Sequence, residues 1–202
     1  MSGECYIFGA GRRTVLEKRP EKEDYIIAAD GGYNYCIEEG IVPNLIVGDF
    51  DSGEKPDTNA EVIVLPEKKD ETDTFFAVKK GLERGFRTFH IYGGTGGRED
   101  HTIANIQTLR YIAERGGCGW LYSENGKAAV IKDGSLTLPK RESGYVSVFS
   151  LTDVSEGVTI SGLGYELESA ELKASYPMGV SNCFTGAESC ISVKNGALLI
   201  MF

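Results

Sequence analysis

Short apolar runs alternate with helical patterns over the greater part of this 202-residue chain. The runs are almost wholly apolar, which is typical of parallel strands that are covered on both faces. Helical patterns cover residues 33–39, 72–84 and 101–115, and each is followed by a glycine. The alternation predicts an α/β domain with a mainly parallel sheet, which binds ligands beyond the carboxyl ends of its strands. The predicted strands span residues 5–8, 25–29, 45–47, 62–65, 89–92 and 128–131.

The composition changes near Pro139. Beyond it, serine, threonine and glycine alternate with apolar residues at a period of two, as in residues 145–149 and 190–193. Short strands separated by turn residues predict a small antiparallel β-sandwich. We therefore expect two domains, an α/β domain over residues 1–133 and an all-β domain over residues 134–202.

Charge and cysteine usage restrict the class of protein. The formal net charge is −9, which argues against a nucleic-acid partner because such a backbone needs clustered lysines and arginines. No signal peptide is evident at the start, and no apolar run approaches the ~20 residues that cross a bilayer. We expect a cytoplasmic protein without a membrane partner. Free thiols fit this expectation, since no CxxC spacing occurs among Cys5, Cys36, Cys118, Cys183 and Cys190.

Acidic residues follow the ends of several predicted strands. Asp30 precedes two glycines, and Asp49 and Asp51 stand two residues apart, so their side chains point the same way on an extended segment. Asp73 begins a helix, where the unpaired N–H groups and the dipole can bind an anion. Oxygen ligands of this kind suit Mg²⁺ that is shared with phosphate. The simpler alternative is that these acids only form solvated turns or cap helices. Taken together, the pattern favours an enzyme of phosphoryl or pyrophosphoryl transfer.

A glycine-rich segment, residues 93–97, leads from a predicted strand into a helix. It lacks the Gly-Lys-Ser/Thr of a Walker A loop and the spacing of the dinucleotide fingerprint. Arg98 and Asp100 follow at once, and an arginine that a carboxylate orients can pair with phosphate. For His101, helix capping or packing is the preferred interpretation. The loop indicates a phosphate site of no standard type.

Five blocks in this order resemble the thiamine pyrophosphokinase family, whose members make thiamine diphosphate and AMP from thiamine and ATP. They are residues 29–32, 48–52, 72–73, the segment 93–105 with its Gly-Gly, Arg-Glu-Asp-His and Asn, and residues 179–182. The resemblance implies a nucleotide-binding catalytic α/β domain and a thiamine-binding, dimerising β-sandwich. It also implies a homodimer with shared active sites, and ATP, thiamine and Mg²⁺ as ligands.

The resemblance assigns roles to individual residues. The metal ligands would be Asp30, Asp49, Asp51 and Asp73. The catalytic group would be Asp49, Asp51, Asp73, Arg98 and Asp100. The ATP site would include Asp30, Lys69, Thr72, Gly93, Gly94 and Asn105. The thiamine site, contributed across the dimer, would include Ser181 and Asn182.

The chain departs from the family pattern in two places. Some members carry a tryptophan near the C-terminus that stacks on thiamine, whereas the single tryptophan here is Trp120, so Phe184 is the candidate aromatic contact. Cys183 stands directly after Ser181-Asn182, where family members often have an acidic residue. Three alternatives stay open: a pyrophosphokinase for another alcohol such as a hydroxymethylpterin, a Mg-dependent phosphohydrolase, and a nucleotide sensor. Either Asp73 or Asp100 could accept the proton of the attacking hydroxyl.

Overall fold

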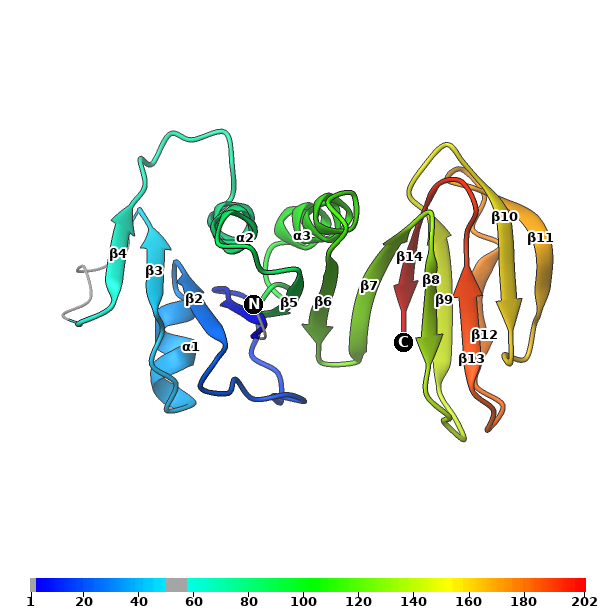
Figure 1. Cartoon of the computed structure of the whole chain (residues 1–202), viewed down its shortest axis with the longest axis horizontal. Helices are drawn as coiled ribbons and strands as arrows, with labels where there is room; N and C mark the ends of the chain where they lie inside the picture. Colours follow the sequence, from blue (N-terminus) through cyan, green and yellow to red (C-terminus); the bar gives the residue numbers. More distant parts are fainter. Residues whose placement is uncertain (1–2, 50–57) are drawn as a thin grey trace. The chain divides into compact units, whose positions relative to one another are not determined.

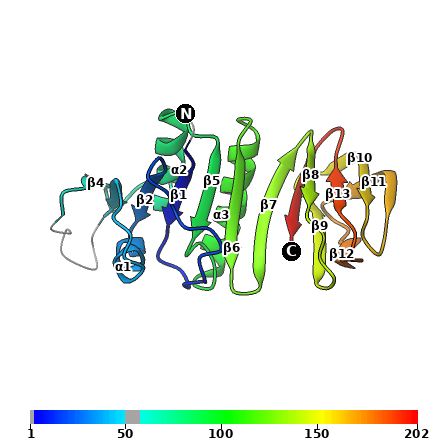
Figure 2. The same cartoon turned by 60° about the horizontal axis from the view of Figure 1, so that its bottom comes forward.

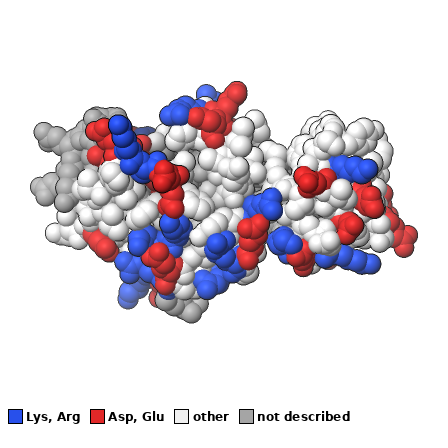
Figure 3. Space-filling model, turned by 90° about the horizontal axis from the view of Figure 1, so that it is seen from above, with Lys and Arg blue, Asp and Glu red and all other residues white. Residues whose placement is uncertain are grey.

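A computed structural model describes residues 3–49 and 58–202. These residues form two compact units, Met1–Glu124 and Asn125–Phe202. No helix in the described ranges is both long enough and apolar enough to cross a membrane. On the face shown in Figure 3, basic and acidic side chains are interspersed.

The first unit contains a six-stranded parallel sheet. Its strand order is β4-β3-β2-β1-β5-β6, and every pairing is parallel. The fold class predicted from the apolar runs is therefore confirmed. The strands are β1 (Cys5–Phe8), β2 (Tyr25–Ala29), β3 (Leu45–Gly48), β4 (Glu61–Val64), β5 (Thr88–Tyr92) and β6 (Cys118–Ser123).

Helices cover both faces of this sheet because the strands are apolar on both. Helix α1 (Gly32–Glu38) lies on the opposite side of the strands from α2 (Asp73–Glu83), as Figure 2 shows. Tyr6 and Phe8 of β1 share a buried cluster with Tyr35 of α1. Helix α3 (Glu99–Ala113) lies beside α2 and packs on β6 (Figure 1). All three helices end close to the glycines that the sequence marks as stops.

The second unit is a sandwich of two antiparallel four-stranded sheets. One has the order β12-β9-β14-β7 and the other β11-β10-β13-β8. A single apolar cluster draws on both sheets and includes Val146, Val158, Ile191 and Leu198. The antiparallel sandwich predicted from the period-two pattern is thus confirmed. Its strands are β7 (Gly126–Lys132), β8 (Ser135–Leu138), β9 (Tyr145–Ser150), β10 (Val154–Ser161), β11 (Leu167–Lys173), β12 (Gly179–Cys183), β13 (Ser189–Ser192) and β14 (Ala197–Met201).

Two features differ from the sequence expectation. Strand β6, which pairs in parallel with β5, was not predicted from the sequence. Strand β7 was counted with the first domain, but it pairs antiparallel with β14 at the other end of the chain. The units accordingly divide between Glu124 and Asn125 rather than between residues 133 and 134.

Candidate functional site

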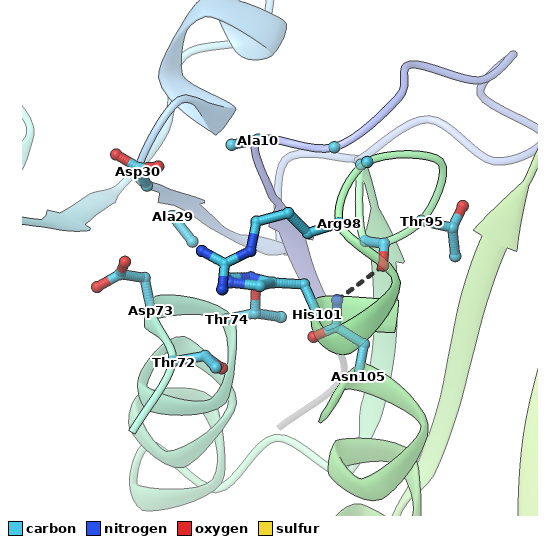
Figure 4. A pocket seen from close by; sticks show the side chains of 14 residues that line it. Ala10, Ala29, Asp30, Thr72, Asp73, Thr74, Thr95, Arg98, His101 and Asn105 are labelled. Atoms are coloured by element: carbon cyan, nitrogen blue, oxygen red, sulfur yellow. Dashed lines mark hydrogen bonds between the residues drawn. The ribbon is translucent and has the colours of Figure 1, made fainter. Parts of the chain in front are cut away.

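A pocket of about 300 Å³ opens beyond the carboxyl ends of β1, β2 and β5, beside the N-terminal ends of α2 and α3 (Figure 4). Parallel α/β sheets place ligand sites at this edge. The pocket is lined by Ala10, Gly11, Ala29, Asp30, Thr72, Asp73, Thr74, Gly93, Gly94, Thr95, Gly97, Arg98, His101 and Asn105. Seven predicted site residues therefore meet in one place: Asp30, Thr72, Asp73, Gly93, Gly94, Arg98 and Asn105.

Two glycine segments form one wall of the pocket. The Gly9 N–H donates to the carbonyl of Tyr92 at 2.8 Å, and the Gly11 N–H donates to the carbonyl of Gly93 at 2.7 Å. Gly93 has a φ of +64°, and a Cβ atom there would lie 2.4 Å from the carbonyl oxygen of Gly9. Only glycine permits this approach of two backbones. The resulting wall presents backbone rather than side chains to a ligand.

Asn105 supports the same wall from α3. Its side chain is 4% exposed, and its Nδ2 donates to the carbonyl of Gly94 at 2.8 Å (Figure 4). The Thr72 side chain is also engaged in a hydrogen bond: its Oγ1 caps α2 by accepting from the Phe75 N–H at 3.2 Å. Both residues were predicted to bind ATP. The structure gives each of them a hydrogen bond that shapes the site.

Three of the predicted acids gather at the sheet edge next to this wall. Asp30 follows β2 in a left-handed conformation with a φ of 51°, which is costly for a residue other than glycine. Asp49 follows β3, and Asp73 is the first residue of α2. Asp51, also predicted as a ligand and catalytic residue, lies outside the described residues.

Lys69 lies between two of these acids. Its Nζ is 2.8 Å from Asp49 Oδ2, to which it donates a hydrogen bond, and 2.7 Å from Asp73 Oδ1. The second contact is an ion pair without hydrogen-bond alignment, so Asp73 Oδ1 is buried without a hydrogen-bond partner. All three side chains are less than one-fifth exposed. Lys69 was predicted to line the nucleotide site, and the structure shows it as the counter-ion of the acids.

The titration of these groups reflects their crowding. Burial raises the pKa of Asp73 above its usual value, the contact with Lys69 opposes this, and the like charges of Asp49 and Asp30 add to it. Burial disfavours the charged form of Lys69, but its close contacts with the negative charges of Asp49 and Asp73 outweigh that effect and raise its pKa. The site thus concentrates negative charge that a cation has to offset.

The acids fit a hard divalent cation. Within residues 3–49 and 58–202, no three His, Cys, Asp or Glu side chains form a closed metal-binding group. Mg²⁺ does not require one, because it keeps several waters and is commonly held by one or two carboxylates together with substrate phosphates. Asp49 and Asp73 supply such oxygens, and Asp73 Oδ1 lacks a hydrogen-bond partner.

Arg98 brings positive charge to the open side of the pocket. Its side chain extends across the pocket next to His101 (Figure 4). Asp100 holds the guanidinium through contacts of 3.1 Å from Nε to Oδ1 and 2.6 Å from Nη2 to Oδ2. Both side chains are exposed, and the contact with Arg98 lowers the pKa of Asp100. Asp100 itself does not line the pocket.

The predicted thiamine residues lie in the second unit. Ser181 is exposed on β12 and has a φ of 60°. Asn182 is buried: its Oδ1 accepts from the N–H groups of Tyr165 and Cys183, and its Nδ2 donates to the Tyr165 carbonyl at 2.6 Å. Phe184 is 6% exposed and belongs to the sandwich core, so it offers little surface for stacking.

Two pocket residues, Thr74 and Thr95, were not proposed as ligands from the sequence. Thr74 lies in the first turn of α2, and Thr95 lies within the glycine segment. Their only sequence signal was their position inside motifs that were noted for other residues. Figure 4 shows both hydroxyl-bearing side chains at the pocket.

Comparison with known proteins points to one family. Residues 16–117 match the thiamin pyrophosphokinase catalytic domain, and residues 135–198 match the thiamin pyrophosphokinase vitamin B1 binding domain. Thiamine pyrophosphokinase of Bacillus subtilis (strain 168) is 25% identical over 182 residues, which cover 87% of this chain and 85% of that protein. Thiamin pyrophosphokinase 1 of Caenorhabditis elegans is 29% identical over 211 residues, covering 94% and 84%.

Solved structures share the fold. A crystal structure of thiamine pyrophosphokinase from Bacillus subtilis superposes with a TM-score of 0.86 at 23% identity, covering 99% of this chain and 98% of that one. Thiamin pyrophosphokinase from Candida albicans gives a TM-score of 0.77 at 15% identity, with coverage of 98% and 89%. Both domain models match in the expected order, and together they span more than half of the chain. The chain therefore belongs to the thiamin pyrophosphokinase family.

Proposed function

We propose that this protein transfers the pyrophosphoryl group of ATP to the hydroxyl of thiamine, giving thiamine diphosphate and AMP. The observation that carries the proposal is the convergence of Asp30, Asp73, the glycine wall and Arg98 around one pocket in a chain of this family. A pterin acceptor is not favoured, because the second unit matches a vitamin B1 binding domain. The phosphohydrolase and sensor alternatives have no comparable support.

The reaction joins the hydroxyl oxygen of thiamine to the β-phosphorus of ATP. The bond between the β-phosphorus and the bridging oxygen to the α-phosphate breaks, and AMP leaves with that electron pair. The hydroxyl proton passes to a base, for which Asp73 and Asp100 remain the two candidates. Little covalent chemistry falls to the protein in such a transfer, so placement and charge neutralisation carry the catalysis.

Each wall of the pocket has a part in that placement. The glycine wall lets the polyphosphate approach the backbone closely, and Asn105 keeps the loop in position through the Gly94 carbonyl. Arg98, which Asp100 orients, pairs with phosphate oxygens and stabilises their charge as the bond breaks. Thr72 holds the start of α2, whose N-terminal dipole favours the same anion.

Mg²⁺ completes the proposed site. Asp49 and Asp73 would hold it, with Asp30 and Asp51 as the further predicted ligands, and when bound it neutralises phosphate charge. The remaining parts of the proposal follow the family: Ser181 and Asn182 contribute to the thiamine site, and the protein acts in the cytoplasm as a homodimer with shared sites. The five cysteines are free thiols, which is consistent with a reducing compartment.

The test is AMP formation from Mg-ATP with and without thiamine, with the product identified by mass spectrometry. Thiamine-dependent AMP together with thiamine diphosphate is the expected result. Phosphate or AMP release that does not depend on thiamine would replace the proposal by a hydrolase. No turnover with thiamine, but turnover with a hydroxymethylpterin, would change the acceptor, and ATP binding without any turnover would favour a sensor.

A further inference from the structure

The contact of Lys69 with Asp49 and Asp73 has a consequence for cation binding. The Nζ atom lies 2.8 Å from an oxygen of Asp49 and 2.7 Å from an oxygen of Asp73. The ammonium contacts one oxygen of each carboxylate, and a divalent cation held by the same two carboxylates would be drawn to the same negative charge next to a like-charged ammonium. The two cations thus compete for one pair of acids.

The contacts of Lys69 connect three separate parts of the chain. Lys69 lies in the segment between β4 and α2, Asp49 follows β3, and Asp73 opens α2. Without the ammonium, two mostly buried carboxylates would lose the positive charge that they share, and Asp30 adds negative charge to the same region. The side chain of Lys69 is only 17% exposed, so it lies against the acids rather than in solvent.

Neighbouring lysines do not share this arrangement. Lys68 is exposed one residue earlier. Lys79 pairs instead with Glu71, through contacts of 2.7 and 2.9 Å. Lys69 is therefore distinguished by its two partners and not by a general excess of positive charge in the segment.

We propose that Lys69 is a built-in counter-ion that holds Asp49 and Asp73 in the cation-free protein and is displaced when a divalent cation binds. This inference rests on the proposed function, because it takes these acids as the Mg²⁺ site. Lys69 stabilises the cation-free site and at the same time weakens divalent-cation binding. The ammonium that is released becomes available to the phosphates of the incoming nucleotide.

The variant Lys69→Met removes the charge and keeps most of the side-chain length. Without divalent cation, we expect the variant to melt at a lower temperature than the wild type. Mg²⁺ alone should then raise its melting temperature by more than it raises that of the wild type. Mn²⁺, titrated as a spectroscopic probe by electron paramagnetic resonance, should bind the variant about tenfold or more tightly, which corresponds to about 1.4 kcal/mol.

Lys79→Met is the matched control, since it removes an ammonium from a different ion pair, the one that Lys79 of α2 forms with Glu71. Its response to Mg²⁺ and its Mn²⁺ affinity should equal those of the wild type. Equal affinities of Lys69→Met and the wild type for Mn²⁺, or weaker binding by Lys69→Met, would overturn the proposal. The same shift in Lys79→Met would do so too, because it would reduce the effect to net charge.

A second measurement needs no variant. Limited acetylation of the wild-type lysines, followed by peptide mass spectrometry, reports how available each ammonium is. Saturating Mg²⁺ should increase the acetylation of Lys69 relative to Lys79, whereas unchanged or reduced acetylation of Lys69 would contradict displacement. Neither readout requires turnover. If the cation effects appear but no thiamine diphosphate forms, the proposed function fails and the counter-ion role stands; if the product forms without these effects, only the counter-ion role fails.

Discussion

The glycine wall and the acid pair lie at the same end of the first sheet but are held by different forces. At the wall, backbone contacts the backbone: Gly11 donates to Gly93, and no side chain separates the two segments. At the acid pair, the link is the ammonium of Lys69 between Asp49 and Asp73. We therefore expect the wall to be insensitive to salt and metal, and the acid pair to respond to both.

This difference separates two requirements of a polyphosphate site. Close approach to phosphate needs a rigid surface without side chains, which only a fixed backbone provides. Cation binding needs ligands that can exchange one positive partner for another. A single kind of contact could not meet both needs, and we expect the chain to use one kind for each. Substitutions at the wall and at the acid pair should therefore have different consequences.

Gly93→Ala should cause the largest loss of stability. The new Cβ atom would lie 2.4 Å from the Gly9 carbonyl oxygen, and the φ of +64° is unfavourable for alanine. We expect the free energy of unfolding to fall by about 3 kcal/mol, measured by urea denaturation. Gly97→Ala is the control, because its nearest neighbour would be the Gly11 Cα at an ordinary 3.8 Å. Similar losses in both variants would mean that the wall is not held by close backbone approach.

Asp73→Asn should abolish most of the activity while leaving the fold intact. The change removes the charge of a proposed cation ligand and keeps the shape of the side chain. We expect the rate of thiamine diphosphate formation to fall by about 100-fold or more, with an unchanged circular dichroism spectrum. Asp70→Asn, in an exposed position on the same segment, should retain nearly normal turnover. Near-normal turnover of folded Asp73→Asn would remove this residue from the site.

His90 is a buried titratable group away from the acid pair, and its pKa is set mainly by burial. Because a carboxylate can only accept, its Nε2–H donates to Glu4 at 2.7 Å, and the Tyr122 hydroxyl donates to Nδ1 at 2.9 Å. Burial lowers the pKa of His90 from 6.5, although Glu4 opposes this. The unfolded chain therefore binds the proton first as the pH falls. Stability should be complete above pH 6.5 and decline below it.

The measurement is the free energy of unfolding as a function of pH for the wild type and for His90→Gln. The variant should show a flatter profile just below pH 6.5, with an effect smaller than that of Gly93→Ala. The chain has only two histidines, so His101→Gln is a complete control and should keep the wild-type slope. A wild-type slope in His90→Gln would assign the pH dependence to other groups.

The sequence predicted the α/β layer well because buried parallel strands leave an unmistakable apolar pattern. It missed β6, where Gly119 and Ser123 interrupt the run, and it placed β7 in the wrong half. The partner of β7 is β14, and no local pattern reports a pairing between segments so far apart. Local composition was enough to predict most of the strands and helices. The domain to which β7 belongs depends on its pairing with a strand far away in the sequence.

For the site, the sequence supplied the acids and the glycines but not the contacts among them. Lys69 and Asp49 are 20 residues apart, and nothing in either motif indicates that they meet. Asn105 and Asn182 carry a different lesson. Both stand in family motifs and were predicted to bind substrates, yet both are buried and bonded to backbone groups. A motif match by itself does not distinguish residues that shape a site from residues that touch the ligand.

Asp100→Asn should produce the smallest change in stability and so isolates function from folding. The Arg98–Asp100 ion pair is exposed on both sides, with side-chain exposures of 73% and 62%, and exposed pairs contribute little to folding. The melting temperature should therefore match that of the wild type. Turnover should still fall by roughly 10-fold to 100-fold, since Arg98 loses the partner that orients it toward the phosphates. Unlike the acid pair around Lys69, the Arg98–Asp100 pair would then contribute to ligand binding and turnover but not to folding stability. A melting temperature that falls together with turnover would show that the pair also stabilises the loop.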